Sequence, residues 1–173
     1  MNCIIRPLLL EDEPFLWEML YQALHVPEGQ TAPSHEVIHL PQLARYVHGW
    51  GREGDCGFLA SDAATGQPVG AVWLRLLIRQ NKGYGYVGDD TPELSIAVLP
   101  EHRGQGIGTE LLTCLVASVR GHSSISLSVS EGNSALRLYE RFGFEVVSKS
   151  AESLTMKRAL KANSGGLITV LHN

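Results

Sequence analysis

The most informative pattern of the chain is the stretch Glu93 to Thr109, ELSIAVLPEHRGQGIGT. Its first part is predicted to be a strand, because apolar residues occupy every second position. Pro100 ends that strand, since proline cannot donate to a β-ladder. RGQGIG follows, and the segment behind it has the apolar spacing of a helix. A strand, a glycine-rich turn and a helix N-terminus predict an anion site for a phosphate or pyrophosphate.

Two familiar phosphate loops do not fit this stretch. A Walker A loop needs GxxxxGK followed by Ser or Thr, but no lysine lies between Lys82 and Lys149. A dinucleotide-binding loop needs GxGxxG, whereas Gly104, Gly106 and Gly108 are spaced GxGxG. No strand–helix–strand pattern precedes these glycines either, so a different ligand class is indicated.

Two motifs resemble those of the GNAT acetyltransferase superfamily. RGQGIG is similar to its (Q/R)xxGx(G/A) signature, with Arg103, Gly106 and Gly108 at the fixed positions. NSALRLYERFGF, Asn133 to Phe144, is similar to its second motif, an Asn followed by ALxLYxxxGF. The motifs occur in the expected order with a strand-like ISLSV between them, and the resemblance covers roughly residues 2–160.

The periodicities along the chain predict the order βααβββαβαββ, which is an α+β fold and the order of the resembling superfamily. Residues 1–160 are therefore expected to form one domain. By the resemblance, its sheet is mixed, largely antiparallel and splayed open beside the fourth strand. The tail 161–173 contains an apolar ITVL and is predicted either to be flexible or to add an edge strand to a partner, giving a homodimer.

The resemblance implies that acetyl-CoA is the co-substrate. Its pyrophosphate would rest on backbone N–H groups of the glycine loop, and its pantetheine arm would pair with the preceding strand. The N–H of Val98 would polarise the thioester carbonyl. The residues expected to contact coenzyme A are Ile96, Ala97, Val98, Arg103, Gly104, Gln105, Gly106, Ile107, Gly108, Thr109, Asn133 and Tyr139.

Acetyl transfer to a protonated amine needs a base, and thiolate departure needs an acid. Glu93 begins the strand before the loop, where resembling enzymes often keep a carboxylate base that acts directly or through water. Ser95 faces the same side and is expected to hold such a water. Tyr139 matches the motif tyrosine, expected near the thioester sulfur as the acid. These residues favour an N-acetyltransferase over the alternative, a GNAT-like module that senses acyl-CoA without turnover.

The acceptor is expected to be a primary amine of a small molecule or peptide. A helix predicted over residues 42–50, including Tyr46, either packs on the sheet or lines the acceptor pocket. The glycine-bearing loop 79–92 is either a mobile extension or a binding loop. Its specificity candidates are Tyr84, Tyr86, Asp89 and Asp90. The acidic pair with Glu93 favours a cationic acceptor.

Composition excludes several other classes. The net charge of −4 argues against nucleic acid as the main partner. No apolar run approaches the ~20 residues of a membrane span, and MNCIIRPLLLEDE lacks the apolar core of a signal peptide. The three scattered cysteines lack CxxC spacing, so a reducing cytoplasm without disulfides or structural zinc is predicted.

One motif points elsewhere. HEVIH, His35 to His39, satisfies the HExxH pattern of zinc hydrolases. Ser34 is placed to cap this turn, and Pro41 disfavours a helix at Leu40, so a continuous metal-binding helix does not fit. We therefore predict a capped turn and no metal site.

Overall fold

The structure is a computed structural model, described here over residues 2–161. Its helices and strands follow the predicted order. They are β1 (Cys3–Pro7), α1 (Glu13–Gln22), α2 (Pro41–Ala44), β2 (Cys56–Asp62), β3 (Pro68–Arg75), β4 (Glu93–Val98), α3 (Ile107–Ser118), β5 (Ser124–Val129), α4 (Leu136–Arg141), β6 (Glu145–Lys149) and β7 (Leu154–Ala159). The two predictions for the tail, a flexible end or a partner's edge strand, fall outside the described residues from position 162 onward.

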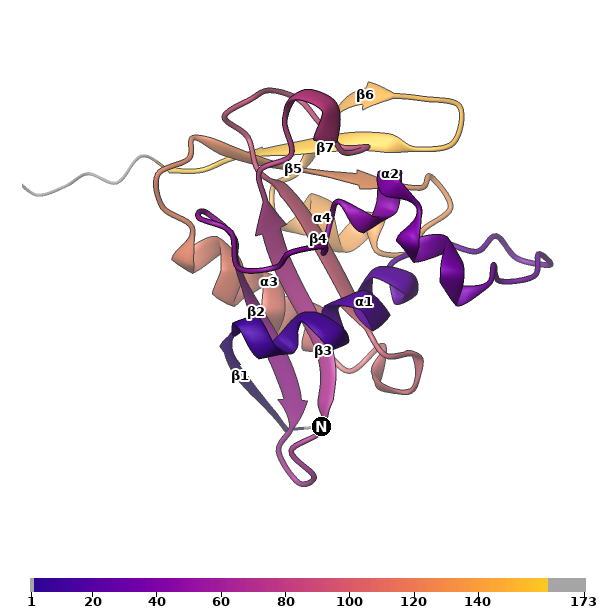
Figure 1. Ribbon diagram of the computed structural model, residues 1–173, viewed down its shortest axis with the longest axis vertical. Helices are drawn as coiled ribbons and strands as arrows, with labels where there is room; N and C mark the ends of the chain where they lie inside the picture. The colour runs from indigo at the N-terminus through magenta and orange to yellow at the C-terminus, as the bar shows by residue number, and fades with distance from the viewer. Residues whose placement is uncertain (1, 162–173) are drawn as a thin grey trace, which may run out of the picture.

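The strands form one open, seven-stranded sheet in the order β1-β2-β3-β4-β5-β7-β6. Neighbours pair antiparallel, except that β4 and β5 are parallel. This confirms the predicted α+β fold with a mixed, largely antiparallel sheet. In Figure 1, β6 and β7 cross the top of the molecule while β2 and β3 run lengthwise, so the sheet is strongly twisted.

Helices cover both faces of the sheet, which buries the central strands on two sides. Successive side chains of a strand point to opposite faces. On one face, Ala71 and Trp73 of β3 join the core beneath α1, which lies across the front of the sheet in Figure 1. On the other, Val72 and Leu74 join the core that contains α3. Because both faces are covered, β3 is almost wholly buried.

The second helix is much shorter than predicted. The expected helix over residues 42–50 ends at Ala44, and the chain continues as turns. The carbonyls of Arg45 and His48 accept hydrogen bonds from Arg75, and the carbonyl of Tyr46 accepts one from Trp73. Side chains of β3 therefore occupy carbonyls that a longer helix would use for its own backbone bonds.

Other element boundaries moved by a few residues. α3 begins at Ile107, two residues before the predicted start, and α4 begins at Leu136, three residues after Asn133. The predicted half-buried strand β5 is instead buried on both sides, with Ser124 and Ser126 almost inaccessible.

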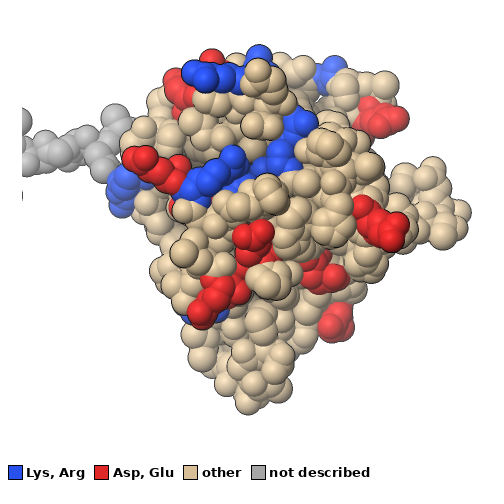
Figure 2. All heavy atoms as spheres, viewed as in Figure 1, with Lys and Arg blue, Asp and Glu red and all other residues tan. Residues whose placement is uncertain are grey.

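No described helix has the length and apolar character that a membrane crossing requires. Figure 2 shows acidic residues and a band of Lys and Arg on the same face.

Candidate active site

The sheet opens between β4 and β5. These strands share one register pair, Glu93 with Ser126, supported by a 3.1 Å bond from the N–H of Ser126 to the carbonyl of Pro92. Beyond this pair they diverge toward the C-terminal end of β4. The splay expected at the fourth strand is thereby confirmed, and Glu93 lies at its closed end.

The backbone of β4 presents unpaired groups to this opening. The N–H of Leu99 bonds the carbonyl of Val69 on β3 at 2.8 Å. Because bonded and non-bonded pairs alternate along an antiparallel ladder, Ala97 and Ser95 also bond β3. The amide groups of Ile96 and Val98 therefore point away from β3, toward the gap. An extended ligand carrying amides would find a β-strand edge there.

A cavity of about 1260 Å³ fills the opening. One wall comes from the end of α1 and the loop behind it, and a second comes from β4 and the glycine loop. The third comes from the end of β5 and the segment leading into α4. Predicted site residues that line it are Glu93, Ser95, Ile96, Ala97, Val98, Arg103, Gly104, Gly106, Ile107, Gly108, Thr109, Asn133 and Tyr139.

The glycine loop forms one end of the cavity. Gly104 and Gly106 have φ of +72° and +84°, in the left-handed region that favours glycine. A Cβ at either residue would meet no atom within 4 Å, so the space beside them is free. Gly106 is the N-cap of the 12-residue helix α3, and the cap makes no side-chain hydrogen bond. The first N–H groups of the helix are thus available to an anion.

Two side chains of this loop contact protein atoms. Nε of Arg103 donates to the carbonyl of Val98 at 3.0 Å, and the Nη2 group reaches the carbonyl and Oε1 of Gln22 at 3.3 and 3.2 Å. The guanidinium thus joins the end of β4 to the end of α1. The amide of Gln105 donates to the carbonyl of Glu101, and Gln105 does not line the cavity. Side-chain contact of either residue with phosphate stays a prediction.

Glu93 is a buried carboxyl at the other end of the cavity, 3% exposed. Its Oε1 accepts hydrogen bonds from Oη of Tyr46 at 2.5 Å and from the N–H of Gly85 at 2.8 Å. Burial raises the pKa of Glu93 above its usual value, and the two hydrogen bonds partly offset that rise. Its Oε2 has no hydrogen-bond partner within residues 2–161, and neither has the hydroxyl of its register partner Ser126. A buried carboxyl of raised pKa beside a cavity is suited to accept a proton.

Tyr139 lines the cavity from α4 and is 8% exposed. Burial raises its pKa to about 12, so the phenol keeps its proton at neutral pH. Its ring meets Phe144 edge to face, with centroids 6.0 Å apart. Gly143, at φ +82°, ends this helical segment as predicted, and Oδ1 of Asn133 accepts from the N–H of Ala135 at the turn before it. Asn133 and Gly143 of the motif thus bound the helical segment that carries Tyr139.

The acidic cluster expected around the acceptor is divided in the structure. Asp89 accepts from the hydroxyl of Tyr86, and Asp90 accepts from the hydroxyl of Thr91. None of Tyr86, Asp89 and Asp90 lines the cavity, whereas Tyr84 does. Glu93 and Glu152 are the carboxylates that line it among the described residues.

The HExxH segment forms a single 3₁₀ turn, His35–His39, and Ser34 caps it through the N–H of Glu36. Its histidines pack on α1: His35 stacks on Tyr21 at 3.6 Å between ring centroids, and His39 lies 5.0 Å from Trp17. Within residues 2–161, no group of three or more His, Cys, Asp or Glu side chains is placed to hold a metal ion. The histidines of the motif therefore pack against aromatic rings of α1.

Comparison with known proteins identifies the family. The model of the acetyltransferase (GNAT) family matches residues 17–144. The chain belongs to this family. It is 37% identical over 78 residues to the [ribosomal protein bS18]-alanine N-acetyltransferase of Haemophilus influenzae, a match that covers 41% of this chain and 53% of that protein. The chain thus spans about half the length of this curated relative.

Solved structures support the same fold. The ribosomal-protein-S18-alanine N-acetyltransferase of Escherichia coli aligns with a TM-score of 0.63 and 20% identity, over 96% of this chain and 99% of that one. A putative acetyltransferase from Salmonella typhimurium, solved with its cofactor acetyl-CoA, aligns with a TM-score of 0.66 and 19% identity, over 95% and 97%. At these identities the likeness establishes the fold.

Part of the cavity wall lies outside the site residues predicted from the sequence. Tyr46 was expected only as a helix residue that packs or lines a pocket, and its bond to Glu93 links residues 47 positions apart. The loop behind α1, which includes His25 and Pro33, also lines the cavity without having been singled out. The glycines of KGYGY were a usable signal, because closely spaced glycines often mark a close approach of the backbone to another group.

Proposed function

We propose that this protein is an acetyl-CoA-dependent N-acetyltransferase acting on an amine with a single positive charge at its reacting end. One observation carries the proposal: a cleft between diverging parallel strands has a glycine-lined helix N-terminus at one end and a buried carboxyl at the other. Membership of the GNAT acetyltransferase family supports it.

The residues of the cleft suit coenzyme A. Free space beside Gly104 and Gly106, together with the uncapped start of α3, would accommodate a pyrophosphate. The amides of Ile96 and Val98 would pair with the amides of the pantetheine arm. Acetyl-CoA supplies the activated acyl group as a thioester. The side chain of Arg103 would hold α1 against the end of β4 and so keep the loop in place.

Three residues of this chain would carry the transfer. Glu93 would accept the proton that the amine must lose before it attacks, directly or through water beside Ser95. The N–H of Val98 would stabilise the negative charge that develops on the carbonyl oxygen. Tyr139, with a pKa of about 12, stays protonated and would donate toward the leaving sulfur. Because a free thiol has a pKa of ~8.5, this donation would stabilise the thiolate without requiring complete proton transfer.

The acceptor proposal follows from charge. A polyamine carries several ammonium groups, and each buried ammonium needs a compensating carboxylate. At its closed end the cavity offers Glu93 among largely apolar and aromatic neighbours that include Leu43, Tyr46 and Tyr84. An amine with one charge next to uncharged groups suits this better. The N-terminal amine of a protein is such a group, and alanine N-acetylation is the activity that names two of the similar proteins.

The test is a thiol-release assay with acetyl-CoA and a panel of acceptors, with mass spectrometry of the product. The panel should pair a short peptide with N-terminal alanine and butylamine against spermidine. We expect kcat/KM to favour the single-charge amines by about tenfold or more. Each further ammonium group of spermidine would be buried without a compensating carboxylate. Preference for spermidine would overturn the acceptor class. Tight coenzyme binding without turnover on any amine would favour the acyl-CoA-sensing alternative.

A further inference from the structure

The carboxyl of Glu93 is enclosed by groups from two other segments. Tyr46 and the N–H of Gly85 both bond its Oε1, and the N–H of Tyr84 donates to the same Tyr46 hydroxyl at 2.8 Å. Gly83 covers the other oxygen: a Cβ there would lie 2.1 Å from Oε2 of Glu93 and 2.5 Å from Oη of Tyr46. The groups of Tyr46, Gly83, Tyr84 and Gly85 that enclose the carboxyl form what we call the seat of Glu93. The seat includes no residue of the RGQGIG loop and no backbone group of β4 that faces the gap.

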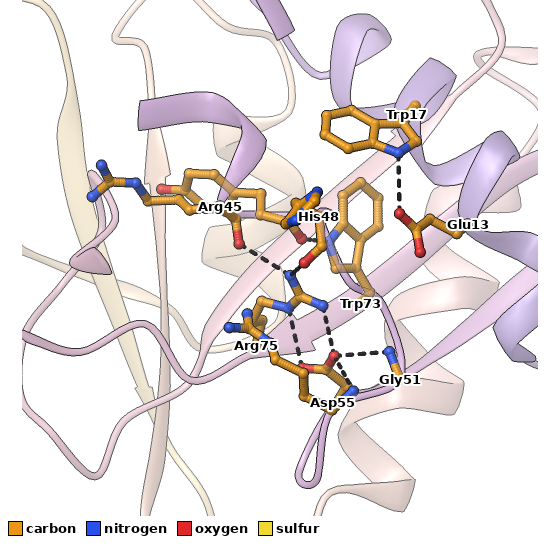
Figure 3. A network of polar contacts seen from close by, with 10 residues as sticks. Glu13, Trp17, Arg45, His48, Gly51, Asp55, Trp73 and Arg75 are labelled. Atoms are coloured by element: carbon orange, nitrogen blue, oxygen red, sulfur yellow. Dashed lines mark hydrogen bonds and ion pairs between the residues drawn. The ribbon is translucent and has the colours of Figure 1, made fainter. Parts of the chain in front are cut away.

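Side chains of β3 hold the turn that carries Tyr46 in place. Nε1 of Trp73 donates to the carbonyl of Tyr46 at 2.9 Å. Nη1 of Arg75 donates to the carbonyls of Arg45 and His48 at 3.1 and 2.7 Å, on either side of Tyr46. Figure 3 shows the Arg75 guanidinium at the centre of these contacts. Three bonds from β3 thus fix the turn that carries Tyr46.

Arg75 is itself locked in place. It is 1% exposed, and its guanidinium forms a bidentate pair with Asp55 at 3.1 and 2.7 Å (Figure 3). Arg75 is also the register partner of Glu93 on the neighbouring strand. The same strand residue therefore sets the position of the carboxyl through the backbone and of Tyr46 through its side chain. The pair fixes the position of the Arg75 guanidinium, although a buried ion pair adds little net stability compared with apolar packing.

The loop over Glu93 is tied to the same turn. Nη1 of Arg45 donates to the carbonyl of Lys82 at 2.5 Å and to that of Gln80 at 3.3 Å. These contacts bring the start of the KGYGY segment down onto the seat. Tyr46 then bonds the segment at Tyr84, and Glu93 bonds it at Gly85.

We propose that Tyr46 is a positioning residue for Glu93, held by Trp73 and Arg75, and that Gly83 and Gly85 let the loop close over the carboxyl. The inference rests on the proposed function in taking Glu93 as the base. It adds that the orientation and proton affinity of this base are set by a turn and a loop outside the two family motifs.

The electrostatic consequence has a definite sign. Burial raises the pKa of Glu93, and the bonds from Tyr46 and Gly85, followed by the charge of Arg45, lower it. From β3, Arg75 faces this region already paired with Asp55, and from β5 the neighbour is uncharged Ser126. Removing the Tyr46 hydroxyl removes a bond that favours the carboxylate, so the pKa of Glu93 rises further.

The first test is Tyr46→Phe, with Tyr86→Phe as the matched control, because Tyr86 loses only its bond to Asp89 outside the cavity. In Tyr46→Phe we expect kcat to fall about tenfold and the acid limb of the kcat/KM profile to move up by about one pH unit. The KM for acetyl-CoA should not change. An acid limb in the wild-type position, or an equal shift in Tyr86→Phe, would overturn the inference.

A second readout does not depend on turnover. Carbon-13 NMR of the glutamate carboxyls, with Glu93→Gln to assign the Glu93 signal, follows its titration directly. We expect this titration to move to higher pH in Tyr46→Phe and to stay in place in Tyr86→Phe. An unmoved titration overturns the seat whatever the activity. Absence of wild-type turnover would instead contradict the proposed function and leave this measurement valid.

The glycines give an independent pair of variants. Gly83→Ala places a Cβ against both Glu93 and Tyr46, whereas Gly88→Ala, in the same loop, approaches Oδ1 of Asp90 at 3.2 Å and Oγ1 of Thr91 at 4.0 Å and touches neither Glu93 nor Tyr46. We expect Gly83→Ala to reduce kcat about tenfold or more with unchanged acetyl-CoA affinity, and Gly88→Ala to keep wild-type kinetics. Equal behaviour of the two variants would remove the loop from the seat.

Discussion

Two glycine-rich segments border the cleft, and they need glycine for different reasons. In RGQGIG, Gly104 and Gly106 have positive φ and empty space where a side chain would be. In KGYGY, Gly83 and Gly85 have no such φ, but a Cβ at either would collide with Glu93 and its neighbours. The first segment uses the conformational freedom of glycine, and the second uses its small size.

This difference separates the two halves of the proposed reaction. The RGQGIG loop leaves the N–H groups at the start of α3, and the space beside Gly104 and Gly106, open to a ligand, which suits the binding of a phosphate. The KGYGY loop is already in contact with protein, and its N–H groups bond Glu93 and Tyr46. Coenzyme binding should therefore depend on the first loop and the protonation of the base on the second.

Gly106→Val tests the RGQGIG loop and should have the largest effect. A β-branched residue at φ +84° is strained, and the loop must change its shape to relieve that strain. We expect acetyl-CoA affinity measured by calorimetry to fall by about a hundredfold, as when several charge-assisted bonds are lost. Gly66→Val is the matched control, since Gly66 has φ +73° in open space on the β2–β3 turn. Wild-type affinity in Gly106→Val would contradict the phosphate role of the loop.

Glu93→Gln tests the proposed role of Glu93 as the base. We expect kcat/KM to fall by about a hundredfold while acetyl-CoA affinity is retained, because the change removes only the base. The ratio of wild-type to variant rates should be largest where Glu93 is ionised and the amine is still protonated. It should shrink at low pH, as Glu93 gains its proton, and again near the amine pKa of ~10. A ratio that does not vary with pH would place the base elsewhere.

Tyr139→Phe should have a smaller effect, a fall in kcat of about tenfold with little change in acetyl-CoA affinity. The phenyl ring keeps its contact with Phe144, so the fold should be maintained. Because the pKa of Tyr139 is about 12, the wild-type profile should show no descending limb from this residue below about pH 10. Unchanged turnover would remove Tyr139 from the donor role.

The smallest expected effect concerns stability. Burial raises the pKa of Glu93 in the folded protein, so this group contributes stability below its unfolded pKa, and that contribution is lost as the pH rises through the folded value. The Gln side chain of the Glu93→Gln variant does not titrate, so the variant does not lose this stability as the pH rises. The difference in Tm between variant and wild type should therefore be more positive at about pH 8 than at about pH 4, by a few degrees. A difference independent of pH would contradict the raised pKa.

The element order and both motifs were predictable from local patterns. Alternating apolar residues identified β4, and Gly106 and Gly143 lie where a helix begins and ends. The helix expected over residues 42–50 was wrong beyond Ala44, because Trp73 and Arg75 occupy its carbonyls from a distant strand. A local pattern carries no information about such competitors.

Local sequence was enough to identify the family and the glycine loop of the proposed donor site, because this loop is one continuous segment whose backbone conformation depends on its own residues. The surroundings of Glu93, where the acceptor is proposed to bind, depend instead on the tertiary structure. It separated Asp89 and Asp90 from Glu93, which are close in sequence, and joined Tyr46 to Glu93, which are far apart. Proton affinity depends on burial and on neighbours in space. In the proposed function, β4 and the loop behind it would bind the donor at one end through their own sequence, and Glu93 would act at the other end through its surroundings.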